Sequence, residues 1–227
     1  MARNDLINKD DLVNNPATRV AICLCLDSSG SMDGKKLDEL NRGIREFYKA
    51  IRNDRIALAS AEICIVTFGG DVKALNEFTT LDFQKDYQIP SAYGGTPMGE
   101  GVKLALKKLE QRKNDYKSAG VDYYEPWLVI MGDGAPDYYS PVDEAARETT
   151  ALEKQKKLSI FSIGIGDDAD MSVLSKFSNK RSALKLKGLQ FSKFFEWLST
   201  SVSAVSRSQP DETIKLDVEG LKGWAEL

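Results

Sequence analysis

The stretch Val20-Ala21-Ile22-Cys23-Leu24-Cys25-Leu26-Asp27-Ser28-Ser29-Gly30-Ser31-Met32 is the part of this sequence that most strongly predicts the fold. Its first seven residues are all apolar, which is typical of a strand buried on both faces at the centre of a parallel sheet. The run ends at Asp27, and Asp27, Ser29 and Ser31 then offer oxygen side chains at alternate positions of a tight turn. Oxygen ligands at this density suit a hard cation such as Mg²⁺.

A plainer interpretation of the same turn uses no metal. Asp, Ser and Gly commonly form turns after strands, and Ser31 could cap a helix that begins near Lys35. The turn alone does not decide between these two interpretations, so the rest of the chain has to be considered.

The composition is that of an ordinary globular protein, with 42% hydrophobic and 29% charged residues in a 227-residue chain. This length suits one domain. The net charge of −3 indicates no broad basic face for nucleic acid or an anionic membrane. The chain has no histidine, which excludes histidine general bases and Ser-His or Cys-His dyads. The three cysteines fall in apolar runs and are predicted to be free thiols in the core.

The beginning of the sequence, residues 1–5, lacks the apolar segment of a secretory signal, and no apolar run approaches 18 residues. We therefore expect a cytoplasmic protein.

Apolar runs and amphipathic segments alternate along the chain. Strands are predicted at 20–26, 61–68, 72–78, 127–131, 158–165 and 183–186, and helices at 37–51, 98–109, 142–152, 171–177 and 191–205. The polar run 112–115 is expected to end the helix before it, and the short turn at 69–71 makes strand 72–78 antiparallel. The pattern predicts an α/β fold, Rossmann-like, with a mostly parallel central sheet, one antiparallel edge strand and helices on both faces.

Three segments are predicted from these patterns. Residues 1–17 form an N-terminal arm, 18–206 the domain and 207–227 a C-terminal tail. The tail alternates Ile214, Leu216 and Val218 with charged residues and contains Trp224, so we expect it to pack on its own domain or, alternatively, on a partner.

Polar side chains recur where the predicted strands of the sheet end. Asp27, Ser29 and Ser31 follow the first strand, Thr96 lies in a Gly-Gly-Thr-Pro loop, and Asp133 follows strand 127–131. Ligands bind to such sheets at the carboxyl ends of the strands. The three loops are therefore predicted to meet at one edge.

Taken together, these motifs resemble the von Willebrand factor type A family, the integrin I-like domains, over residues 18–206. The resemblance implies a metal-ion-dependent adhesion site. Ser29, Ser31 and Thr96 would bind the metal through hydroxyls, and Asp27 and Asp133 directly or through a water. One residue departs from the family pattern, because Gly132 stands where threonine is common before the last aspartate.

The resemblance also implies a function in binding rather than catalysis. A divalent cation, most simply Mg²⁺ with Mn²⁺ or Ca²⁺ as alternatives, would take its last ligand from an Asp or Glu of a partner protein. The motifs Asp27–Met32 and Gly94–Met98 are similar to those of the TerY-like bacterial proteins of tellurium-resistance and stress operons. This similarity implies a cytoplasmic complex, with a kinase or phosphatase encoded nearby as a candidate partner.

Two alternatives use the same loop differently. In a Mg²⁺-dependent phosphatase, Asp27 would accept the phosphoryl group, but Ser29 stands where haloacid-dehalogenase-type enzymes have the general acid. In a nucleotide-binding protein, Ser29–Lys36 would cradle phosphate as a P-loop does. That segment is one residue short, and Lys36 occupies the position of the Mg²⁺-binding Ser or Thr.

Overall fold

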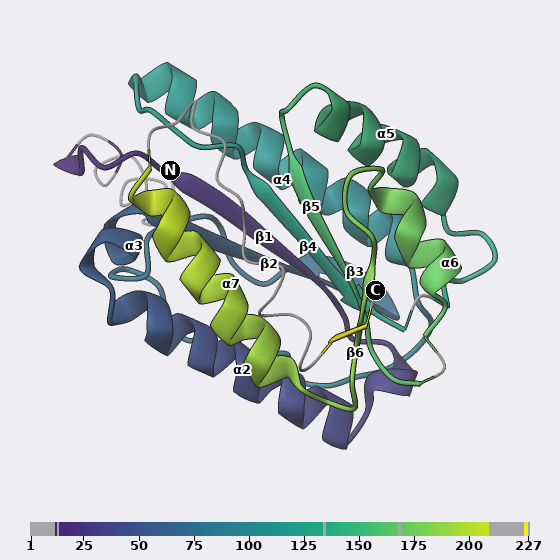
Figure 1. The fold of residues 1–227 in the computed structure, drawn as a ribbon. Coiled ribbons are helices and arrows are strands. Elements are labelled where there is room, and N and C mark those ends of the chain that lie inside the picture. The colour runs from purple at the N-terminus through teal and green to yellow at the C-terminus, as the bar shows by residue number, and fades with distance from the viewer. Residues whose placement is uncertain (1–11, 13, 134, 168, 209–224, 227) are drawn as a thin grey trace.

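A seven-stranded sheet forms the centre of the computed structural model, which describes residues 12, 14–133, 135–167, 169–208 and 225–226 (Figure 1). The strand order is β3-β2-β1-β4-β5-β6-β7, and all neighbours are parallel except β3 and β7, which pair antiparallel with β2 and β6. The strands are β1 (Val20–Asp27), β2 (Ala61–Gly69), β3 (Asp71–Ala74), β4 (Trp127–Gly132), β5 (Ser159–Gly164), β6 (Leu184–Leu186) and β7 (Ala225–Glu226). The predicted α/β class is confirmed, and β7 adds a second antiparallel strand.

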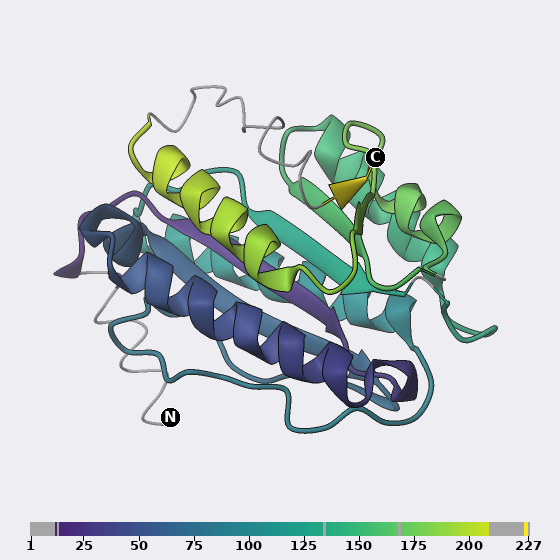
Figure 2. The same ribbon diagram turned by 60° about the horizontal axis from the view of Figure 1, so that its bottom comes forward.

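Helices cover both faces of the sheet (Figures 1 and 2). One layer contains α2 (Lys35–Arg52), α3 (Arg55–Ser60) and α7 (Phe191–Ser206), and the other contains α4 (Met98–Ala119) and α5 (Val142–Lys154). The short helices are η1 (Gly30–Met32), α6 (Met171–Leu174) and η2 (Ser175–Phe177).

The apolar run of β1 is buried on both faces, as its composition predicts. Ile22 and Leu24 face the core beneath α2 and α7, whereas Ala21, Cys23 and Cys25 face the core beneath α4 and α5. Successive side chains of a strand point to opposite faces, so a strand covered twice must be apolar at every position. The cysteines are buried free thiols, in agreement with the sequence.

The sheet has its topological switch point between β1 and β4. The chain passes from β1 to β2 on one side and later returns to β4 on the other side of β1. The connections leaving these two strands therefore diverge, and a crevice for ligands forms at their carboxyl ends. Asp27 ends β1, and Asp133 directly follows β4.

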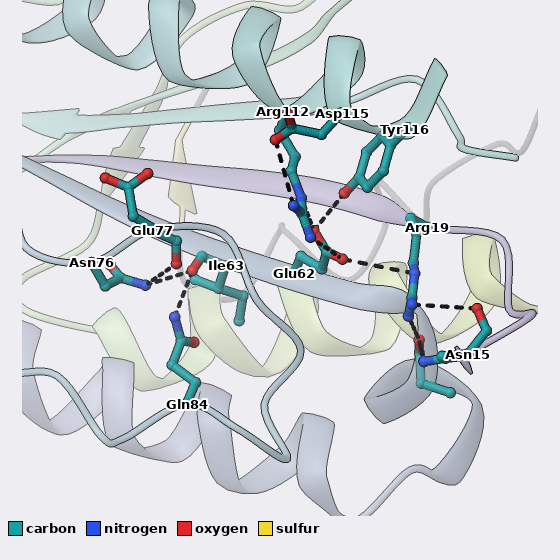
Figure 3. A network of polar contacts seen from close by, with 11 residues as sticks. Asn15, Arg19, Glu62, Ile63, Asn76, Glu77, Gln84, Arg112, Asp115 and Tyr116 are labelled. Carbon is teal, nitrogen blue, oxygen red and sulfur yellow. Dashed lines mark hydrogen bonds and ion pairs between the residues drawn. The ribbon is translucent and has the colours of Figure 1, made fainter. Parts of the chain in front are cut away.

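The prediction that the helix at 98–109 ends before residue 112 is wrong, because α4 continues to Ala119. Arg112 and Tyr116 on its last turns bind Glu62, a fully buried carboxylate of β2 (Figure 3). The contacts measure 2.8 Å from Arg112 Nη2 to Glu62 Oε1 and 2.7 Å from the Tyr116 hydroxyl to Glu62 Oε2. Arg19 approaches the same carboxylate at 3.7 Å. The polar run thus pairs with a buried acid instead of ending the helix.

Two further differences concern short elements. Strand β3 ends at Ala74 rather than near residue 78, because the side chain of Asn76 replaces backbone pairing with β2. Its amide donates to Ile63 O at 2.7 Å (Figure 3). The amide oxygen also accepts a hydrogen bond from Ile65 N at 2.8 Å. Helix α3 was not predicted, and it begins where Asp54 accepts hydrogen bonds from Ile56 N and Ala57 N.

The interpretations of Ile214, Leu216, Val218 and Trp224 lie outside the described residues. Of the C-terminal segment, Ala225 and Glu226 pair with β6 at Leu186 and Lys185. No helix in the described part of the chain is long and apolar enough to cross a membrane.

Candidate metal centre

Backbone hydrogen bonds join the loop after β1 to the loop that carries Thr96. Gly30 N donates to Gly94 O at 3.0 Å, and Tyr93 N donates to Ser28 O at 2.9 Å. These contacts hold residues 93–95 against the turn that follows Asp27. The structure therefore brings together two loops that are more than sixty residues apart in the sequence, as their predicted positions at strand ends require.

Hydroxyl groups connect the first loop to the loop after β4. Ser31 Oγ donates to Asp133 Oδ2 at 2.6 Å, and Ser29 Oγ lies 3.0 Å from Ser31 Oγ. Since the single Ser31 proton is directed to Asp133, the proton between the two serines comes from Ser29. Both hydroxyl oxygens thereby keep lone pairs that can bind a cation.

The serines and Thr96 do not serve as helix caps. The N-cap of α2 is Gly34, and that of α4 is Pro97; neither receives a side-chain cap bond. Ser29 precedes η1 without a side-chain cap bond. The cap interpretation of the first turn is therefore wrong: its hydroxyls contact each other and Asp133 instead of helix N–H groups.

Asp27 is fully buried, and only one of its carboxylate oxygens has a partner. Oδ1 accepts a hydrogen bond from Ser29 N at 2.8 Å, whereas Oδ2 has no hydrogen-bond partner among the described residues. Burial raises the pKa of Asp27 to about 6, and the nearby charge of Asp133 adds to the rise. A buried carboxylate oxygen without a hydrogen-bond partner destabilises the fold, so this arrangement is typical of a carboxylate that binds a cation.

Thr96 is 7% exposed and lies at the end of the loop that leads into α4, directly before the N-cap residue Pro97. Its side chain makes no hydrogen bond within the described part of the chain, while its carbonyl accepts from Met98 N at 2.8 Å and Asp137 N at 3.0 Å. The Thr96 hydroxyl is thus available to bind a cation, and the two hydrogen bonds to its carbonyl hold the backbone in place.

These observations fit a divalent cation held by oxygen. Ser29, Ser31 and Asp133 are in direct contact, and Asp27 and Thr96 lie in the segments joined to them. No group of three His, Cys, Asp or Glu side chains in the described ranges could hold a metal, so a site here depends on the hydroxyls. Two carboxylates and three hydroxyls suit Mg²⁺ or Mn²⁺ rather than a soft metal.

The absence of a side chain at Gly132 leaves space for the Asp27 carboxylate. A Cβ at position 132 would lie 2.8 Å from Asp27 Oδ2 and 3.1 Å from Asp27 Cβ. The departure from the family's common threonine therefore has a steric explanation in this chain. The sequence showed the departure but not this contact, because residue 132 and Asp27 belong to neighbouring strands.

We expect Gly132→Ala to lower the affinity for divalent cations by about tenfold, or 1.4 kcal/mol, because the added methyl group displaces the Asp27 carboxylate. Isothermal titration calorimetry with MgCl₂ and MnCl₂ measures the effect. Gly30→Ala is the matched control, since its Cβ would meet Gly94 O at 3.5 Å and Gly94 N at 3.9 Å, both ordinary contacts. Equal loss in both variants would contradict the steric role of Gly132.

Comparison with known proteins identifies the family of this chain. The profile of the von Willebrand factor type A domain matches residues 21–194, and the chain belongs to this family. Domains of the family are metal-dependent protein-interaction modules. The chain is similar to the inter-alpha-trypsin inhibitor heavy chain H2 of Sus scrofa, with 23% identity over 191 residues, 79% of this chain and 20% of that protein. It therefore spans about a fifth of the length of that relative.

Solved structures share the fold. The pilus adhesin SpaC of Lactobacillus rhamnosus GG superposes with a TM-score of 0.66 at 13% identity, over 82% of this chain and 30% of that one. A von Willebrand factor type A protein of Catenulispora acidiphila gives 0.62 at 15% identity, over 82% and 43% of the two chains. Proximal thread matrix protein 1 of the mussel byssus, solved with zinc in its metal-ion-dependent adhesion site, gives 0.59 at 15% identity, over 85% and 47%.

Proposed function

We propose that this chain is a protein-binding module whose divalent cation is held by Asp27, Ser29, Ser31, Thr96 and Asp133. The observation that carries the proposal is the buried Asp27 Oδ2 without a partner, beside hydroxyls that contact Asp133 instead of capping helices. A carboxylate from a partner protein completes the coordination. Metal and partner then strengthen each other's binding reciprocally.

Mg²⁺ is the cation that we propose, with Mn²⁺ and Ca²⁺ as alternatives. The side chains in question are all oxygen donors, and Mg²⁺ is usually held by few carboxylates and keeps several of its waters. The two aspartates and three hydroxyls support this choice. Zinc occupies the corresponding type of site in the mussel protein, so the calorimetric titrations should include ZnCl₂.

Binding rather than turnover is supported by the burial of Asp27. A phosphatase nucleophile has to touch the phosphorus atom, whereas a carboxylate can hold a cation through a bridging water. Asp27 is 0% exposed, and Ser29 at the general-acid position contacts Ser31. The P-loop alternative has no further support, because Gly30–Met32 form a short 3-10 turn and α2 begins only at Lys35.

The setting that we propose is a cytoplasmic bacterial complex of the tellurium-resistance or stress type. Its support is the similarity of Asp27–Met32 and Gly94–Met98 to the TerY-like proteins. On that basis a kinase or phosphatase encoded beside this protein is a candidate partner. We propose no nucleic-acid or membrane partner, which agrees with the net charge of −3.

We expect the purified protein to bind Mg²⁺ without metal-dependent hydrolysis of p-nitrophenyl phosphate or ATP. Calorimetry measures the binding, and release of nitrophenol or phosphate measures turnover. Hydrolysis that rises with Mg²⁺ and disappears in Asp27→Asn would establish the phosphatase alternative instead. Absence of any divalent-cation binding would overturn the proposed module.

A further inference from the structure

A groove of about 930 Å³ lies at the edge of the sheet opposite the candidate metal centre. Its walls are α3, the end of α7 and the segments that enter β1 and β4, and the residues that line it include Thr18, Asn53, Arg55, Ile56 and Tyr124. Thr18 precedes β1 and Tyr124 precedes β4, so the groove lies at the amino ends of these strands. The candidate metal ligands Asp27 and Asp133 lie at the carboxyl ends of the same two strands. A group bound in the groove is therefore separate from the metal centre.

The carboxylate that lines this groove already has partners for both of its oxygens. Asp54 Oδ1 accepts hydrogen bonds from Ile56 N at 3.1 Å and Ala57 N at 3.3 Å. Asp54 Oδ2 pairs with Arg207, another lining residue, at 2.7 Å. The negative charge of Asp54 is thus balanced by Arg207, and the charge of the second lining arginine, Arg55, is left in excess.

The uncommitted polar side chains of the groove can all donate hydrogen bonds. Arg55 is exposed and forms no ion pair within the ranges that the structure describes. The Thr18 hydroxyl and the Asn53 amide likewise have no hydrogen-bond partner among the described residues. A guanidinium group has donors only and stays charged at any ordinary pH. Free donors beside an unpaired cation are the complement of a carboxylate.

Exposed apolar surface on the same wall favours a peptide over a small anion. Ile56 is 44% exposed and lines the groove together with Arg55. Sites for small molecules usually enclose about 70–90% of the ligand surface. Here Asn53, Arg55 and Ile56 are all exposed, so a small anion would remain largely in solvent. A peptide can instead place an apolar side chain on Ile56 while its carboxylate binds Arg55.

We propose that this groove binds an acidic segment of a second partner protein, with a carboxylate at Arg55 and a neighbouring apolar side chain on Ile56. The domain then joins two proteins, one at each edge of its sheet. Binding at the groove is independent of metal, whereas binding at the metal centre requires it. The inference goes beyond the proposed function and does not depend on it.

The test selects short random peptides on the immobilised full chain in buffer freed of divalent cations with a chelating resin. We expect Asp or Glu next to an apolar residue to be enriched. A selected peptide should bind Arg55→Gln about tenfold more weakly than wild type, because a charge-assisted hydrogen bond is lost. Arg45→Gln is the matched control, since Arg45 is an exposed arginine of α2 outside the groove. It should bind the peptide as wild type does.

A double-mutant cycle tests the contact between the peptide carboxylate and Arg55. Replacing the acidic residue of the peptide with its amide should weaken binding to wild type about tenfold but have little further effect on Arg55→Gln. The peptide affinity of wild type should be the same with and without MgCl₂, and Arg55→Gln should bind Mg²⁺ as wild type does.

Three results would overturn the groove proposal and leave the metal site standing. The first is selection of peptides without acidic residues, and the second is equal peptide binding by wild type and Arg55→Gln. The third is a peptide that binds only the variant Asp211→Asn/Glu212→Gln. That result would show that the acidic residues which follow Ser208 in this chain, rather than a partner protein, occupy the groove.

Discussion

Replacing Asp27 with asparagine is expected to abolish Mg²⁺ binding and, at the same time, to stabilise the metal-free protein. At pH 7.5 the folded protein without metal has to keep a fully buried carboxylate charged, with Oδ2 lacking a partner. Burial raises the pKa of Asp27 to about 6 in the folded protein. The free energy of unfolding of the metal-free protein therefore decreases as the pH rises from about 4 to 6, because the folded state then has to hold this carboxylate in its charged form. A neutral amide avoids that penalty, which amounts to at most about 3 kcal/mol.

Calorimetric Mg²⁺ titration and thermal unfolding in EDTA measure the two effects. Above pH 6 the asparagine variant should unfold at a higher temperature than wild type in EDTA, and added Mg²⁺ should stabilise only the wild type. Asp33→Asn, in the exposed part of the same loop, is the charge-matched control. It should bind Mg²⁺ with wild-type affinity and unfold in EDTA at the wild-type temperature. Wild-type Mg²⁺ affinity in Asp27→Asn would contradict the ligand assignment.

Replacing Glu62 with glutamine is expected to destabilise the fold by about 3–5 kcal/mol, because it removes the buried negative charge that lies beside Arg19 and Arg112. The Glu62 side chain is 0% exposed and lies 3.7 Å from Arg19 and 2.5 Å from Arg112 Nε (Figure 3). This cluster sits near the amino ends of β1 and β2, at the opposite edge of the sheet from Asp27. The affinity for Mg²⁺ of the folded variant should therefore be unchanged.

Urea unfolding measures the loss of stability, and Mg²⁺ titration below the unfolding transition measures the site. Glu77→Gln is the matched control, because Glu77 is 57% exposed and pairs with Lys108 at the surface. Such surface pairs contribute about 0–1 kcal/mol. A stability loss of equal size in both variants would show that burial of the cluster is not what matters.

The sequence by itself predicted the parts of the fold that depend on local patterning. The seven apolar residues before Asp27 specify a strand covered on both faces, and the three- and four-residue spacing in 37–51 and 191–205 specifies helices. The alternation of strands and helices then predicts a parallel sheet, in which the carboxyl ends of the strands lie on the same side. For this reason Asp27, Thr96 and Asp133 could be predicted to lie near one another before their contacts were known.

Contacts between distant segments decided what the sequence could not. Helix α4 continues through Arg112 because Glu62 on another strand neutralises it, and β3 stops early because the Asn76 side chain takes over its pairing. The loop between β4 and α5 lies beside Thr96 because Asp137 N donates a hydrogen bond to Thr96 O, a contact between segments about forty residues apart that local patterning does not predict. Periodicity reports which face of an element is buried, whereas the partner at each position depends on how the elements pack.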